Sequence, residues 1–250
     1  MSLQKKPNIP ADHRLFRASA DRPLALLEQC PVYVPTPLID HPGIAGELIC
    51  DAAGTNDLTS EAARSVAAGM TFTTASAGNH GLSVAAGARI FGAKAVVYLS
   101  SLVPKGFGER IRALGAQVVR IDGVYEDSVA AAKSAALENG WLLLADGSWE
   151  GYIDRPALVM EGYTVLAEEC RAEFERTGIW PTHVLIQAGV GGIAAALAAH
   201  IRSYWSEQPK IIVVEPDAAP CLLESIHNHR LTRVSGPVSN MGRLDCKDAS

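Results

Sequence analysis

The chain has 250 residues, 48% of them hydrophobic, and 22 lysines and arginines stand against 27 aspartates and glutamates, for a formal net charge of −5. This length and composition support one large or two smaller packed domains. Charges are spread without blocks, which argues against nucleic acid and membrane surfaces as partners and favours small polar molecules.

Residues 1–38 are rich in proline and predict no regular secondary structure, with Pro35 and Pro37 marking an extended turn. From about residue 70 strand-like and helix-like segments alternate. Several helix-like segments end at a glycine, which readily adopts the left-handed conformation that closes a helix. We expect strands at 70–76, 93–100, 116–122, 141–146, 182–189 and 210–216, and helices at 81–91, 105–115, 125–140, 156–178 and 191–205.

The expected strands around 95–99 and 211–214 are continuously apolar rather than alternating, which is typical of parallel strands covered by helices on both faces. We therefore predict an α/β fold of two three-layer domains with parallel sheets and a cleft between them. Residues 1–70 would begin a large domain, 71–147 would form a small α/β domain, and 148–250 would continue the large domain.

A loop of small and polar residues, Ser76-Ala77-Gly78-Asn79-His80, joins the strand 70–76 to the next helix. Ligands of open α/β sheets bind at the carboxyl ends of strands. The Ser76 hydroxyl, the Asn79 amide and the backbone N–H groups at the helix start suit a carboxylate or a phosphate. Alternatively, the loop is only a tight left-handed turn with Ser76 or Asn79 as the N-cap.

A second loop, Gly189-Val190-Gly191-Gly192-Ile193, follows the strand 182–189. Its glycines let backbone N–H groups approach an anion, and the helix dipole favours a phosphate there. Gly189, Gly191 and Ala194 also fit a dinucleotide fingerprint, with Glu215 near the place of a ribose-binding acid. A third interpretation is close helix-to-sheet packing. A nicotinamide enzyme does not need the first loop, whereas a one-phosphate cofactor with an amino-acid substrate uses both.

The two loops, with segments 103–128 and 149–169, resemble those of the fold-type II pyridoxal-phosphate enzymes, the group of tryptophan synthase β, threonine synthase and the serine/threonine dehydratases. Within this group the chain is most similar to the diaminopropionate ammonia-lyases. The similarity covers most of residues 33–221. Its most specific parts are Trp149-Glu150-Gly151-Tyr152 and Met160-Glu161-Gly162-Tyr163, and Pro35-Thr36-Pro37-Leu38 adds to it.

The N-terminal residues lack the apolar core of a signal peptide, so we expect a cytoplasmic protein. The resemblance implies a homodimer that binds pyridoxal 5'-phosphate and eliminates ammonia from a small amino acid, with 2,3-diaminopropionate as the first expectation and L-serine or L-threonine as alternatives. The cofactor ring would serve as electron sink. By the same resemblance Asn79 would bond the pyridoxal 3′-oxygen. The phosphate would lie on Gly189, Val190, Gly191, Gly192 and Ile193, and the substrate carboxylate on Ser76, Ala77, Gly78 and His80.

The chain departs from the family where the Schiff-base lysine belongs, between Leu38 and Ser76, because that interval holds no lysine. No catalytic lysine is therefore assigned. We expect that a segment is omitted near residues 46–47 and that the large domain is incomplete at its C-terminal end. The alternative is a lysine-free homologue that binds a ligand without turning it over.

Two further positions differ from family patterns. Lyases of this family that accept D-diaminopropionate carry an aspartate where Ala77 stands, so we expect selectivity for the L-isomer. Some dehydratases bind a divalent ion through a glutamate at the place of Glu215, but Cys221 replaces the second acid, so we predict no metal site. Five scattered cysteines predict free thiols, and His227 and His229 predict a solvated surface.

Overall fold

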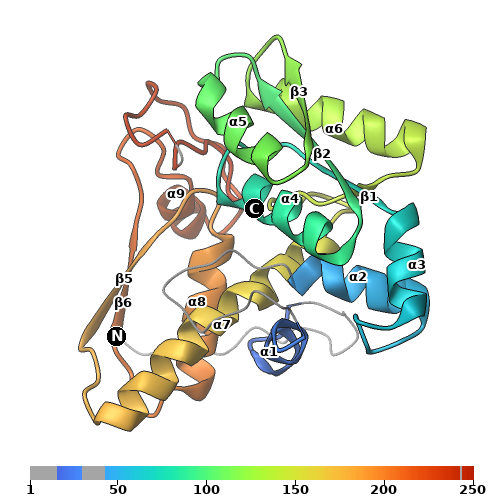
Figure 1. Cartoon of the computed structure of the whole chain (residues 1–250). Helices are drawn as coiled ribbons and strands as arrows, with labels where there is room; N and C mark the ends of the chain where they lie inside the picture. The colour runs from blue at the N-terminus through green and yellow to red at the C-terminus, as the bar shows by residue number, and fades with distance from the viewer. Residues whose placement is uncertain (1–15, 30–42, 243) are drawn as a thin grey trace.

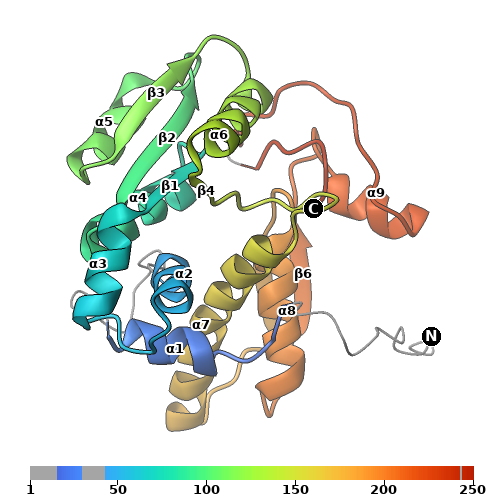
Figure 2. The same ribbon diagram turned by 90° about the vertical axis from the view of Figure 1, so that its right-hand side faces the viewer.

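The computed structural model describes residues 16–29, 43–242 and 244–250. The strands form two separate parallel sheets. The long helix α7 runs between the sheets, and the N-terminal helices lie below the first sheet in the view of Figure 1 (Figures 1 and 2). No helix in these described ranges is long and apolar enough to span a membrane. The helices before the first sheet are α1 (Asp21–Leu27), α2 (Gly43–Ala53) and α3 (Glu61–Gly69).

The first sheet has four parallel strands in the order β3-β2-β1-β4. Phe72, Val97 and Leu99 face a core completed by α4 and α5, while Tyr98, of opposite parity, packs toward α6. The expected helix-sheet-helix layering is therefore confirmed here. Its elements are β1 (Thr71–Thr74), α4 (Asn79–Phe91), β2 (Lys94–Ser100), α5 (Lys105–Ala113), β3 (Gln117–Ile121), α6 (Tyr125–Asn139) and β4 (Leu142–Leu143).

The second sheet pairs two parallel strands, β5 and β6. Ile186 on β5 packs with Leu197 and Ile201 of α8, and α7 closes this core. Leu185, which points to the other face, is 67% exposed, so the described residues form no third layer there. The elements are α7 (Asp154–Thr177), β5 (His183–Gln187), α8 (Gly192–Tyr204), β6 (Lys210–Val214) and α9 (Cys221–Asn228).

Regular structure begins earlier than the proline-rich composition predicts. Helix α1 forms because Leu24 and Leu27 pack against Val165 of α7, a contact that is invisible in the local sequence. Helix α2 runs without a break through residues 46–47, where two helix ends were expected. The omission of a segment at that place stays a prediction. The turn at Pro35 lies outside the described residues.

Buried polar groups on α7 and α8 hold the segment before α1. Glu161, 4% exposed, forms an ion pair with Arg22 and accepts the N–H of Arg17 at 3.1 Å. His200, 1% exposed, places Nδ1 2.7 Å from the carbonyl oxygen of Ala18 and Nε2 3.0 Å from Glu168 Oε2. Because buried polar groups are costly unless paired, these contacts fix residues 17–22 on the two helices.

The Glu168 carboxylate contacts His200 on one side and Arg171 on the other. Hydrogen bonds from Arg171, at 2.8 Å from Nε, hold the pKa of Glu168 below its ordinary value of 4.5 against the opposing effect of burial. A carboxyl whose pKa is lowered in the folded state contributes stability above its unfolded pKa and loses it as the pH falls through the folded value.

We expect Glu168→Gln to lower the free energy of unfolding by about 1 kcal/mol at pH 7, because a charge-assisted hydrogen bond is lost. The difference from the parent chain should shrink as the pH falls from the unfolded pKa of the carboxyl through its lower folded pKa, because the native carboxylate becomes protonated there. Urea unfolding at pH 7 and at a series of lower pH values measures this loss.

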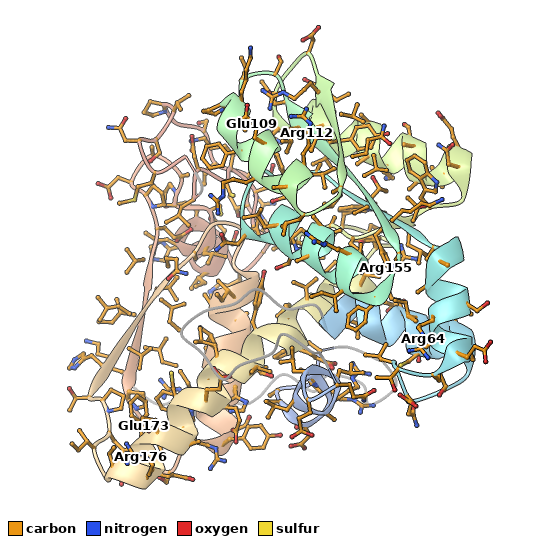
Figure 3. The ribbon with its side chains drawn as sticks, in the orientation of Figure 1. Arg64, Glu109, Arg112, Arg155, Glu173 and Arg176 are labelled. Carbon is orange, nitrogen blue, oxygen red and sulfur yellow. The ribbon has the colours of Figure 1, made fainter. Side chains whose placement is uncertain are left out.

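Glu173→Gln is the matched control, since Glu173 pairs with Arg176 at the same spacing on the same helix. That pair lies in solvent at the outer end of α7 (Figure 3), so its loss should leave stability unchanged. Equal losses for the two variants would contradict the role given to the Glu168–His200 contact.

Candidate active site

The asparagine loop, residues 76–80, turns the end of β1 into the start of α4. Gly78 is the N-cap residue in an extended conformation, with φ −93° and ψ −157°. The Ser76 hydroxyl accepts the N–H of Gly78 at 3.3 Å and does not cap the helix. The interpretation as a left-handed turn capped by Ser76 or Asn79 is therefore wrong. A glycine has no side chain to offer, so the first N–H groups of α4 face the loop without a cap.

Close packing makes Gly81 necessary in this loop. A Cβ at Gly81 would lie 2.0 Å from the carbonyl oxygen of Ser76, so the backbone of the loop rests directly on the first turn of α4. Asn79 is exposed, and its amide makes no hydrogen bond to any other described residue. The His80 ring points the other way, with Nε2 2.8 Å from the carbonyl oxygen of Leu144.

The sequence Trp149-Glu150-Gly151-Tyr152 forms a turn that closes on the end of β4. The Tyr152 hydroxyl donates to the carbonyl of Leu143 and accepts the N–H of Ala145, both at 2.9 Å. Burial raises the pKa of Tyr152, which keeps this hydroxyl protonated. Arg155, at the start of α7 (Figure 3), donates from Nη1 to the same Leu143 carbonyl at 2.8 Å. The sequence motif alone does not indicate these hydrogen-bond partners.

The glycine loop, residues 189–193, joins β5 to α8. Gly191 is the N-cap of α8 in the left-handed region, with φ 109°, and a Cβ there would meet Leu222 at 2.6 Å. The loop therefore presents backbone N–H groups at an uncapped helix start, which suits a phosphate. Cys221 donates its thiol proton to the Gly189 carbonyl at 3.4 Å, and burial raises the pKa of this thiol to about 11.

Glu215 is occupied by helix α9. Its two carboxylate oxygens accept the N–H groups of Leu222 and Leu223 at 2.8 and 3.0 Å. This capping leaves no free carboxylate for a ribose, so the structure does not support the dinucleotide interpretation. Glu215, which directly follows β6, therefore has a structural role as the cap of α9. Across the described part of the chain no group of histidine, cysteine and acidic side chains is arranged to hold a metal ion.

The two loops flank the first half of α7. The asparagine loop reaches the end of β4 through His80, and the glycine loop reaches Met160 of α7, whose Cγ lies 3.7 Å from a Cβ built at Gly192. Ser250, at the end of the chain, lies beside the glycine loop, with its N–H donating to the Val190 carbonyl at 3.0 Å (Figures 1 and 2). The structure thus brings the predicted loops to one region, while the role of each residue in them stays a prediction.

None of the described lysines is assigned to these loops. Lys94, Lys105 and Lys210 are exposed at the starts of β2, α5 and β6. Lys133 lies over the ring of Trp149 at 5.3 Å, and Lys247 donates to the carbonyls of Ala218 and Pro237 at 2.8 and 3.1 Å. Lys5 and Lys6 lie outside the described residues.

The predictions of free thiols and of exposed histidines are confirmed for the described residues. Cys170, Cys221 and Cys246 form no disulfide, and His227 and His229 are exposed on and after α9. Cys30 lies outside the described residues. These side chains therefore give the site no cross-link and no metal-ligand pair.

Comparison with known proteins identifies the family of this chain. Residues 51–250 match the family described as pyridoxal-phosphate dependent enzyme. The chain is 38% identical over 183 residues to diaminopropionate ammonia-lyase of Escherichia coli K12, covering 71% of this chain and 45% of that protein. It is 42% identical over 160 residues to the Salmonella typhimurium enzyme of the same name, covering 62% and 39%. The chain thus spans less than half the length of these curated relatives.

A solved structure agrees with this result. The crystal structure of the Escherichia coli diaminopropionate ammonia-lyase with D-serine superposes with a TM-score of 0.80 at 27% identity, covering 94% of this chain and 68% of that one. The similarity extends over both sheets and so confirms the predicted α/β fold.

We expect Gly81→Ala to lower the free energy of unfolding by about 1–3 kcal/mol, because the new methyl group would overlap the Ser76 carbonyl. Gly106→Ala on α5 is the control, since a Cβ there meets nothing within 4 Å and alanine favours helix. Thermal unfolding of both variants is the measurement. A Gly81→Ala chain as stable as Gly106→Ala would show that the asparagine loop is not packed as described.

Proposed function

Because this chain belongs to the pyridoxal-phosphate dependent enzyme family, we propose that it acts as a carbon–nitrogen lyase on a small amino acid, with 2,3-diaminopropionate as the first substrate. The observation that carries the proposal is the pair of uncapped helix starts at Gly78 and Gly191, which offer two anion sites beside one helix. A carboxylate and a phosphate are the two anions that such a reaction brings together.

The residues present fit the cofactor's phosphate. Gly191 adopts a conformation that other residues rarely take, and α8 begins after it without a side-chain cap, so the N–H groups at this helix start suit an anion. In the proposal these groups hold the phosphate and Asn79 bonds the 3′-oxygen of the ring. When bound, the cofactor supplies an electron sink for the charge left at the substrate Cα after proton loss.

The asparagine loop would hold the substrate. Ser76, Ala77, Gly78 and His80 surround the start of α4, where N–H groups and the helix dipole attract a carboxylate. The overall reaction removes the α-proton and the β-amino group, and water converts the resulting enamine to pyruvate and a second ammonia. Ala77 places no acid beside the loop, which supports selectivity for the L-isomer.

L-Serine and L-threonine are the alternative substrates, because they too lose a β-substituent. A cytoplasmic homodimer is proposed from the family resemblance. A second candidate function is ligand binding without turnover, and one observation favours it: the described lysines are exposed, stacked or hydrogen-bonded elsewhere. The two functions share the same anion sites and differ in whether a covalent bond to the cofactor forms.

The test is direct. The purified chain is titrated with pyridoxal phosphate while its visible absorbance is followed, and ammonia and pyruvate are measured with L- and D-2,3-diaminopropionate, L-serine and L-threonine. Lyase function predicts a Schiff-base band and pyruvate from the L-isomer. Binding with neither band nor product supports the second candidate. Absence of binding overturns both, and equal rates with the D-isomer overturn the selectivity.

We expect Asn79→Ala to raise the dissociation constant for pyridoxal phosphate about tenfold, the effect of losing one hydrogen bond to a charged oxygen. Asn139→Ala, at the far end of α6, is the control because its side chain only contacts the Ala135 carbonyl. Equilibrium dialysis measures both constants. Indistinguishable values would remove Asn79 from the cofactor site.

A further inference from the structure

We infer that the Trp149–Tyr152 turn is a positioning device for the asparagine loop and acts on it through the end of β4. The inference rests on the proposed function only for what the loop binds. The connection itself is a chain of contacts between described residues: Tyr152 to the end of β4, Leu144 to His80, and His80 to its neighbour Asn79.

The turn is rigid by itself. Trp149 and Tyr152 exchange two backbone hydrogen bonds, of 3.2 and 2.8 Å. Their rings stack with centroids 4.3 Å apart and planes 15° apart, and Lys133 of α6 lies over the indole at 5.3 Å. Ring stacking and the cation–π contact restrict the turn to one arrangement. The Tyr152 hydroxyl is therefore held in place before it meets the strand.

The Tyr152 hydroxyl forms hydrogen bonds with the end of β4, an edge strand. β4 pairs with β1 on one side only, so its other edge carries unpaired backbone groups. Tyr152 binds the Leu143 carbonyl and the Ala145 N–H, the two groups that bracket Leu144. A hydroxyl both donates and accepts, so one side chain binds both groups. Arg155 is a second donor to the Leu143 carbonyl, whereas the Ala145 N–H has Tyr152 as its partner. With its donor and an acceptor engaged, this hydroxyl acts as a support for the strand end.

Leu144 passes this position to the loop. It is 1% exposed, its N–H donates to the Thr73 carbonyl at 2.8 Å, and its own carbonyl lies 2.8 Å from His80 Nε2. A carbonyl oxygen only accepts, so Nε2 of His80 must carry the proton. His80 follows Asn79 in the first turn of α4. A displaced Leu144 carbonyl would therefore displace the residues that the proposal gives to cofactor and substrate.

A simple packing role for Tyr152 predicts something different. The phenylalanine ring keeps the stacking and the buried area, so packing alone predicts little change when only the hydroxyl is removed. The contacts above predict a local effect at two places, the end of β4 and the asparagine loop. These places meet at the hydrogen bond between His80 and Leu144, which are 64 residues apart in the sequence.

Hydrogen–deuterium exchange of the chain without cofactor tests this. Tyr152→Phe should raise the exchange rates of amides 82–85, the first hydrogen-bonded amides of α4, about tenfold, together with those of 143–145, by freeing one hydrogen-bonded link. Tyr204→Phe is the control, since Tyr204 lies on α8 against His200 and is 47% exposed. It should leave both segments unchanged.

Variants of His80 locate the link. His80→Leu should speed exchange at 82–85 about as much as Tyr152→Phe does, and His80→Gln, which retains an N–H donor, should restore protection. The double variant Tyr152→Phe with His80→Leu should exchange no faster at 82–85 than either single variant. Faster exchange at 143–145 alone, additive effects, or a uniform rise over the whole chain would overturn the inference.

The result is separate from the proposed function, because exchange is measured without cofactor. Loss of coupling with normal binding of pyridoxal phosphate would overturn only the positioning role. Coupling without any binding would overturn only the proposed function. If both hold, Tyr152→Phe should weaken the binding of pyridoxal phosphate about as much as Asn79→Ala does. Tyr204→Phe should leave this binding unchanged.

Discussion

Two helix starts with glycine as the N-cap residue are the constraint on which the site depends. The N-cap residues of α4 and α8 are both glycines, so the first N–H groups of each helix receive no acceptor from the residue that usually supplies one. Parallel pairing puts each helix start at the carboxyl edge of its sheet. The fold thus keeps two positive helix ends available for anions, and the surrounding contacts serve to hold them open.

The supporting contacts differ between the two starts. The asparagine loop is held by backbone packing at Gly81 and by the His80 contact with Leu144, while the glycine loop is held by Leu222 against Gly191 and by the Cys221 thiol on Gly189. Glu215 adds the cap of α9 that places Leu222. Residues far apart in the chain therefore fix each loop.

Family membership explains the two loops, while two features belong to this chain. Ala77 places no acid in the asparagine loop, and the interval from Leu38 to Ser76 holds no lysine. In that interval Ile49 of α2, and Leu58 between α2 and α3, pack into the same core as Phe72 of β1. The first sheet is thus supported on its α4 face by α2 and α3 regardless of how the cofactor is attached.

The sequence by itself determined the alternation of strands and helices, the parallel α/β class and the identity of both loops, because hydrophobic periodicity and glycine placement are local signals. Tertiary structure decided the rest. Helix α1 exists through its contact with Val165, Gly78 rather than Ser76 became the N-cap, and Glu215 turned to α9. The link from Tyr152 to His80 joins groups that are distant in sequence, and only folding brings such partners within hydrogen-bonding distance.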